Sequence, residues 1–348
     1  MSENDPYFRE ITIPPLPELN EDYLPNNASV HFHLTAHSLA EHVAGLQQLY
    51  DEADVFIPEM YGWTAKSLRD WNAISKGERK TYVRYQQTPS ADSHGGFTNA
   101  LLDLTYRKYK PIRFIDDDAR DSPKKSAAKL WQAQTTEQAL QALADQTADD
   151  AQDAVRRNII MAEKLGPTVS GAIEANPKLR NKDDVKVLVF IGSLHELLYD
   201  YFRTNPATHH KVSASHLAGL SNADADVAIH KRIETGKAPR RSDLVTYLVT
   251  MALCQVQIPS IRSGYLVELT DIVQVKPDQE VLAARQLIKL MAQDIDNPEV
   301  EDAILRACKG RGKPANIIQD YALKARELSA QDAARSSILE RHVAQTHS

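Results

Sequence analysis

The sequence lacks the features that identify membrane or secreted proteins. It has two cysteines in 348 residues, Cys254 and Cys308, and their separation fits neither a zinc site nor a disulfide framework. No apolar run approaches the roughly 18 residues of a membrane-spanning helix. The first 22 residues contain no basic segment followed by an apolar run, so we expect no secretory signal. These absences predict a cytoplasmic protein with no membrane partner.

Positive charge is not in surplus either. The chain has 41 Lys and Arg against 47 Asp and Glu, which gives a net charge of −6 with His neutral. The basic residues are scattered, whereas a nucleic-acid-binding domain usually has a basic face, so we expect no nucleic-acid partner. The sequence also lacks the G-x-G-x-x-G, Walker A, G-x-S-x-G and C-x-x-C patterns. Nucleotide binding, serine hydrolysis and thiol redox chemistry therefore have no motif support.

The chain does have the composition of an ordinary globular protein. Hydrophobic residues make up 42% and charged residues 25%, enough for a sizeable core. The pattern divides into three parts. Residues 1–27 form an extended, Pro-rich lead-in, residues 28–215 an α/β core, and residues 216–348 a helical C-terminal region.

Four short apolar runs predict strands, and each is separated from the next by helical patterns. This alternation favours an α/β fold with a mainly parallel central sheet and helices on both faces. The strands are expected at 30–34, 53–59, 111–116 and 185–191. Beyond about residue 213 the period is 3.6-like, so we expect almost only helix, at 242–256, 278–294, 298–309 and 315–328.

Two tetrads carry most of the functional information. Leu34-Thr35-Ala36-His37 and Gly192-Ser193-Leu194-His195 each follow a predicted strand and precede a predicted helix. Open α/β sheets bind ligands at the carboxyl ends of their strands, so the two histidines are expected to meet over one sheet edge. Glu59 ends a third predicted strand. We therefore expect His37, Glu59 and His195 to line one cleft.

The chemistry of these residue types leaves alternatives open. Imidazole ligates metals and transfers protons near neutral pH, but a single histidine after a strand can also cap a helix. Glu59 fits a general base or a metal ligand, and equally an N-cap or surface carboxylate. Arg157, on a helical stripe with Met161 and Leu165, could bind a substrate carboxylate or phosphate, orient Glu59, or form a structural ion pair.

The order of these motifs resembles that of a known superfamily. The matching segments are Leu34-Thr35-Ala36-His37, Glu59, Lys110-Pro111-Ile112-Arg113-Phe114-Ile115-Asp116, Arg157-Asn158-Ile159-Ile160-Met161-Ala162 and Gly192-Ser193-Leu194-His195. Over residues 29–200 the chain is similar to TraB proteins, Tiki proteases, erythromycin esterases and ChaN-type haem-binding proteins. Two positions depart from the pattern. Leu34 stands where the family usually has Gly, and Pro58 precedes Glu59 in what should be a strand.

The resemblance implies a fold like that of the erythromycin esterases and ChaN. It also implies a hydrolase of an ester or peptide-like bond, acting on a small-molecule or peptide substrate. The implied catalytic residues are His37, Glu59, Arg157 and His195, and a divalent metal (Mn, Co or Zn) would be held by His37, Glu59 and His195. The alternative is a ChaN-type protein that binds haem or another ligand without turnover. A third possibility is a core without activity whose helical region serves as a partner surface.

Other polar residues are weaker candidates. His31 and His33 form an H-x-H pattern that also occurs in amidohydrolase-type barrels, but the helical second half does not supply eight strand–helix units. We expect His33 near the site and His31 in a structural role. Asp116 is expected to support the site, and Asp117 and Asp118 to cap the following helix.

Overall fold

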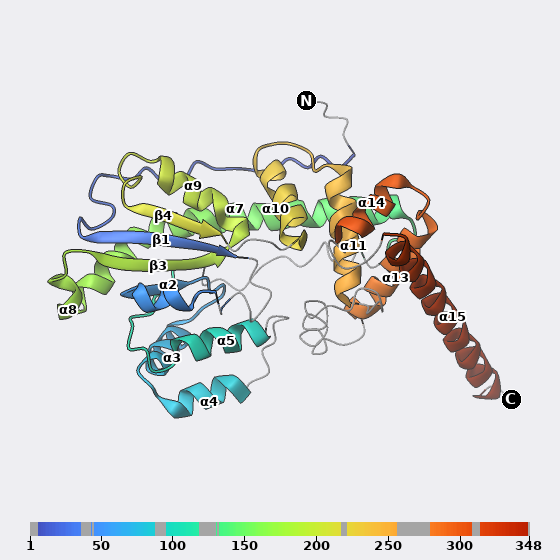
Figure 1. The fold of residues 1–348 in the computed structure, drawn as a ribbon, viewed down its shortest axis with the longest axis horizontal. Helices are drawn as coiled ribbons and strands as arrows, with labels where there is room; N and C mark the ends of the chain where they lie inside the picture. The colour runs from blue at the N-terminus through green and yellow to red at the C-terminus, as the bar shows by residue number, and fades with distance from the viewer. Residues whose placement is uncertain are drawn as a thin grey trace.

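The core of the protein is a four-stranded parallel sheet (Figure 1). The computed structural model describes residues 6–35, 43, 45–87, 95–117, 130, 132–216, 221–255, 279–307 and 314–346. The strand order is β2-β3-β1-β4, and every pairing is parallel. The strands are β1 (Ala28–Thr35), β2 (Val55–Pro58), β3 (Val185–Gly192) and β4 (Val212–His216).

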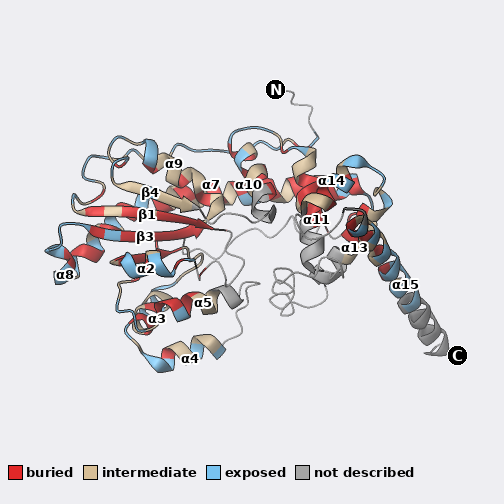
Figure 2. Cartoon of the chain, in the orientation of Figure 1, coloured by how far each residue is buried: buried red, intermediate tan, exposed pale blue. Residues whose placement is uncertain are grey.

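Helices cover both faces of the sheet, as the alternation of elements predicts. The side chains of β3 alternate between two cores: Val187 and Val189 lie in one, Leu188 and Phe190 in the other. The first core includes the long α7 (Thr136–Glu174) and α9 (Glu196–Thr204). The second includes α2 (Gln47–Glu52), α3 (Ala65–Ser75) and α5 (Gly95–Thr105), with α4 (Arg79–Gln87) packed against α3 and α5. Most residues of β1, β2 and β3 are buried, whereas the described residues of β4 are half-buried or exposed (Figure 2).

One predicted strand does not form. Residues 111–116 make a single isolated bridge to β2, between Ile112 and Phe56. Farther out, the side-chain amide of Asn72 accepts from the Ile112 N–H at 3.0 Å and donates to its carbonyl at 2.9 Å. The Asn72 amide thus takes the hydrogen bonds of the Ile112 N–H and carbonyl that a further strand would otherwise make.

One strand was missed by the sequence prediction, which placed the last strand at 185–191. β4 is parallel to β1, with His31 opposite Ser213 and His33 opposite Ser215. Its sequence, Val-Ser-Ala-Ser-His, has little apolar content and gave no strand signal. The free edge of β1 provides the backbone partners instead.

The lead-in is extended and runs along α7. Tyr7 contacts Glu137, Arg9 contacts Asp145, and Thr12 contacts Gln152. Farther along, the Tyr23 hydroxyl donates to the Ala162 carbonyl and accepts from the Gly166 N–H at 2.9 Å. A Cβ on Gly166 would lie 2.3 Å from the Tyr23 carbonyl oxygen, so only glycine allows this approach. The lead-in therefore fixes α7, the helix that carries Arg157.

The described residues after β4 are almost wholly helical, as predicted. The helices are α10 (Ser221–Glu234), α11 (Arg241–Gln255), α13 (Gln279–Gln293), α14 (Pro298–Ala307) and α15 (Pro314–Thr346). They form a separate core with the first half of α7 (Figure 1). The remaining short helical segments are α8 (Pro177–Arg180) and η1 (Ser193–His195). Among the described residues, no helix combines the length and apolarity needed to span a membrane.

Candidate functional site

The candidate site lies where the chain connections diverge. β1 and β3 are neighbours, but β1 leads through α2 to β2 on one side of the sheet, and β3 leads through α9 to β4 on the other. α2 and α9 also pack in opposite cores. Such a topological switch point leaves a crevice outside the carboxyl ends of the strands, where α/β proteins bind ligands. Thr35 and Gly192 face one another at this point.

Glu59 is placed at this edge by the end of β2. Its backbone N–H donates to the Phe190 carbonyl at 2.7 Å, whereas the Phe56 N–H points to the other side of the strand and donates to Pro111. Because N–H groups alternate sides along a strand, the N–H that Pro58 lacks would face away from β3. Pro58 therefore leaves the β2–β3 ladder intact.

Two donors and one imidazole nitrogen converge on the Glu59 carboxylate. Arg157 Nη2 donates to Oε1, and the Gly192 N–H donates to Oε2 at 2.6 Å. His195 Nε2 lies 3.2 Å from Oε1. A Cβ on Gly192 would lie 3.1 Å from Oε2, so glycine at this position gives the carboxylate its space. These contacts stabilise the charged form of Glu59.

Arg157 bridges two carboxylates. It lies on the same stripe of α7 as Met161 and Leu165, which are fully buried against the sheet. Its Nε and Nη2 donate to Asp116 at 2.9 and 2.6 Å, and Nη2 also donates to Glu59. Burial alone would lower the pKa of Arg157, but the charges of Glu59 and Asp116 raise it above its ordinary value. The guanidinium is therefore charged, and it compensates the fully buried Asp116 and the partly exposed Glu59.

His195 is held by the neighbour of Arg157 on the helix. Its Nδ1 lies 2.6 Å from Asn158 Oδ1, and its side chain is buried. An amide oxygen can only accept, so Nδ1 carries a proton. The position that can exchange a proton with Glu59 is therefore Nε2. The resemblance motif contained Asn158, but no role was predicted for it.

The aspartates after Ile115 do not behave alike. Asp116 is fully buried and supports the site through Arg157, as predicted. Asp117 is buried and pairs with Arg156. Its expected role as a helix cap stays a prediction, because the residues that follow it lie outside the described part of the chain. Asp118 lies outside the described residues. Asp116 and Asp117 therefore each neutralise one of two consecutive arginines on α7.

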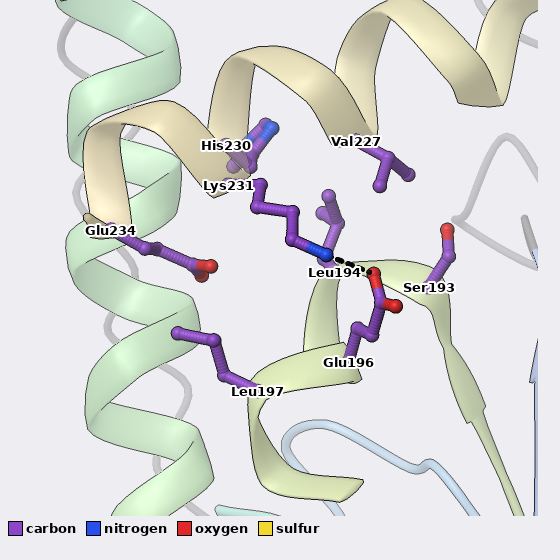
Figure 3. A pocket seen from close by; sticks show the side chains of 8 residues that line it. All are labelled: Ser193, Leu194, Glu196, Leu197, Val227, His230, Lys231 and Glu234. Atoms are coloured by element: carbon purple, nitrogen blue, oxygen red, sulfur yellow. Dashed lines mark hydrogen bonds and ion pairs between the residues drawn. The ribbon is translucent and has the colours of Figure 1, made fainter. Parts of the chain in front are cut away.

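A small cavity lies beside the turn that carries His195 (Figure 3). Ser193, Leu194, Glu196 and Leu197 form one wall, and α10 supplies the other. On α10, Glu234 is 7% exposed, and burial raises its pKa to about 7. The charges of His230 and Lys231 lower this pKa, and that of Glu196 raises it. Lys231 reaches Glu196 at 3.5 Å rather than Glu234.

The structure brings together three of the four predicted catalytic residues: Glu59, Arg157 and His195. His37, the fourth, lies outside the described residues, so its place in the site stays a prediction. His33 and His31 were expected near the site and in a structural role, respectively. Both lie on the opposite face of β1 from Phe32, which packs in the α7 core, and both contact β4.

The donor set does not fit a metal site as it stands. Within the part of the chain that the structure describes, no three His, Cys, Asp or Glu residues are grouped to hold a metal. Both oxygens of Glu59 and both nitrogens of His195 already take part in hydrogen bonds. Metal or haem ligation by His195 would have to displace Glu59 or Asn158. Ligation by His37, Glu59 and His195 therefore stays a prediction.

Taken together, the structure defines a class: an α/β protein with a parallel sheet and a buried ion network at the topological switch point. A scan against protein-family models and searches of curated proteins and of solved structures gave no match. The resemblance to the TraB and erythromycin esterase superfamily therefore depends on the quoted motifs alone.

Proposed function

We propose that this protein is a hydrolase of an ester or peptide-like bond and that Glu59 and His195 carry its proton transfers. The observation that supports this most directly is the contact of 3.2 Å between Glu59 Oε1 and His195 Nε2 at the switch point. A carboxylate and an adjacent imidazole can transfer one proton from one to the other. Such a pair suits general acid–base catalysis near neutral pH.

In this proposal, a water molecule attacks the carbonyl carbon of the substrate and loses its proton to the Glu59–His195 pair. The pair then returns the proton to the leaving alkoxide or amine, so the protein is unchanged after turnover. Gly192 N–H and Asn158 keep the carboxylate and the imidazole in place. Neither group needs a bound metal for this role.

Arg157 would act on the substrate as well as on Glu59. Its bonds to Glu59 and Asp116 use Nε and Nη2, and Nη1 has no partner among the described residues. A guanidinium donor at this edge can bind the carbonyl oxygen as negative charge develops on it. A small-molecule or peptide substrate fits this chemistry.

The test is turnover of a panel of ester and peptide substrates by the wild type and by Glu59→Gln. The amide keeps the shape of the side chain but accepts protons poorly, so we expect turnover to fall by about 10²–10⁴-fold. Glu10→Gln, at an exposed position of the lead-in, is the matched control and should keep full turnover.

Assays with a chelator and with added Mn, Co or Zn test the metal prediction separately. Wild-type turnover that Glu59→Gln leaves unchanged would contradict the proposal. If the wild type turns over none of the substrates and instead acquires a haem absorption band that His195→Ala lacks, the ligand-binding alternative would replace it.

A further inference from the structure

A second polar cluster lies on the other face of the sheet from Arg157. Side chains alternate along β1, so His31, His33 and Thr35 share the face opposite to Phe32. β4 places Ser213 beside His31 and Ser215 beside His33. The cluster therefore comes from two neighbouring strands, and it approaches the same carboxyl edge as Glu59.

Four of these side chains form one continuous hydrogen-bonded chain. Ser213 Oγ lies 2.9 Å from His31 Nδ1, and His31 Nε2 lies 2.8 Å from Ser215 Oγ. Ser215 Oγ in turn lies 2.8 Å from His33 Nδ1. Ser213 is exposed, whereas His33 is 5% exposed and its ring stacks on Phe190. The chain thus leads from solvent to a buried imidazole.

The number of protons restricts this chain to two arrangements. A neutral imidazole has one N–H, so each ring donates through one nitrogen and accepts at the other. The Ser215 hydroxyl proton has no acceptor among the described residues besides the two rings, so it points to one of them, and the other ring donates to Ser215. Both histidines therefore carry their proton on Nε2, or both carry it on Nδ1. Burial lowers the pKa of His31, which favours the neutral ring that this scheme requires.

Switching between the two arrangements moves a proton through the protein. His33 releases its Nε2 proton and takes the Ser215 proton on Nδ1. Ser215 takes the Nε2 proton of His31, His31 takes the proton of Ser213, and Ser213 regains one from water. One proton enters from solvent and one leaves at His33 Nε2, so the four hydrogen-bonded side chains together stay neutral.

Next to His33, at the buried end of the hydrogen-bonded series, the hydroxyl of Thr35 indicates that a ligand binds. Thr35 follows His33 by two residues on the same face and is 2% exposed. Among the described residues, no group hydrogen-bonds its buried Oγ1. A buried hydroxyl without a partner is costly, so a polar group is expected to bind there. Thr35 ends β1 opposite Gly192, at the switch point.

We propose that Ser213, His31, Ser215 and His33 form a proton relay between solvent and an oxygen ligand bound at Thr35. The ligand class is a molecule whose carbonyl, hydroxyl or carboxyl oxygen gains or loses a proton. This site is separate from the Glu59–His195 pair, and it would exist even if that pair were not catalytic.

The test is the tautomer of each ring, read from long-range ¹H–¹⁵N spectra of the full chain labelled at histidine, at a pH where both rings are neutral. In the wild type we expect His31 and His33 to carry their proton on the same type of nitrogen. Ser213→Asp places an acceptor without a proton at the exposed end, which forces the His31 proton onto Nδ1. Through Ser215, the proton of His33 should then move to Nδ1 as well.

Two controls make this result specific. Ser213→Asn offers both a donor and an acceptor, so it should leave the tautomers of the wild type in place. In Ser213→Asp combined with Ser215→Ala, only His31 should respond, because the link to His33 is lost. The proposal is overturned if the wild-type rings carry their protons on unlike nitrogens, or if in Ser213→Asp alone His31 carries its proton on Nδ1 while His33 carries its proton on Nε2.

Discussion

Two glutamates that are largely shielded from solvent, Glu59 and Glu234, lie on either side of the turn Ser193–His195 and are stabilised in opposite ways. Glu59 receives hydrogen bonds from Arg157 and Gly192, and it contacts His195. Glu234, across the cavity, has an Oε1 atom with no hydrogen-bond partner among the described residues, and burial raises its pKa to about 7. Glu59 keeps its charge beside the charge of Arg157, whereas Glu234 binds a proton up to near neutral pH.

The difference shows that burial alone does not decide how a carboxylate behaves. A buried charge is tolerated when a partner of opposite charge and hydrogen-bond donors replace water. Where they are missing, the group takes up a proton instead. Arg157 makes this difference for Glu59, whereas Lys231, on the same helix as Glu234, pairs with Glu196. Substitutions at Arg157, at Glu234 and at Glu59 test this comparison.

The largest expected effect comes from removing the cation. Arg157→Met should lower the free energy of unfolding by about 3–5 kcal/mol, because it leaves Glu59 and the fully buried Asp116 without a counter-charge. Chemical denaturation of both proteins measures this difference. The control is Arg203→Met, whose side chain is 55% exposed and pairs with the partly exposed Asp200, and which should cost about 1 kcal/mol or less. Equal losses in the two variants would show that Arg157 is not special.

The second effect is a pH dependence that belongs to Glu234. Its pKa is 4.5 in the unfolded chain and about 7 in the folded one, so folding binds a proton between these values. The free energy of unfolding should therefore fall as the pH rises from 4.5 to 7, by about 3 kcal/mol in total. Glu234→Gln removes this loss, so the variant should be more stable than the wild type above pH 7. Urea unfolding across this pH range measures it.

The same substitution at the other glutamate sharpens the contrast. Glu59→Gln should destabilise the protein, because Arg157 then has only Asp116 as a charged partner. If both Gln variants are stabilised at high pH, the distinction between the two carboxylates is wrong.

The smallest effect concerns the space around Glu59. Gly192→Ala places a Cβ 3.1 Å from Glu59 Oε2, so the carboxylate has to move by a few tenths of an ångström. Gly192 has a φ of −63°, which alanine adopts freely, so backbone strain does not contribute. We expect a loss of about 1 kcal/mol. Thermal unfolding checks this value, and a stability equal to that of the wild type would show that Glu59 has room to spare.

The sequence predicted the meeting of Glu59 and His195 better than it predicted the sheet. Glu59 and His195 were recognised because each follows an apolar run, and strand ends at one sheet edge bring such residues together. β4 was missed, since its stability comes from the free edge of β1 and not from its own composition. The 111–116 segment was taken for a strand because it is apolar, but Asn72 satisfies the outer edge of Ile112 where another strand would pair.

By itself, the sequence determined the strand–helix alternation, the helical second half and the residues at the strand ends, because periodicity and local patterns depend only on near neighbours. The tertiary structure decided which of these residues touch. It paired Arg157 with both Glu59 and Asp116 and placed Asn158 against His195. It also left Glu234 Oε1 without a hydrogen-bond partner among the described residues. It also joined His31 and His33 to the serines of β4. These contacts join residues far apart in the chain. Only packing fixes the distances between them and excludes water, and it therefore decides whether a polar group there is charged, is neutral or shares a proton with its partner.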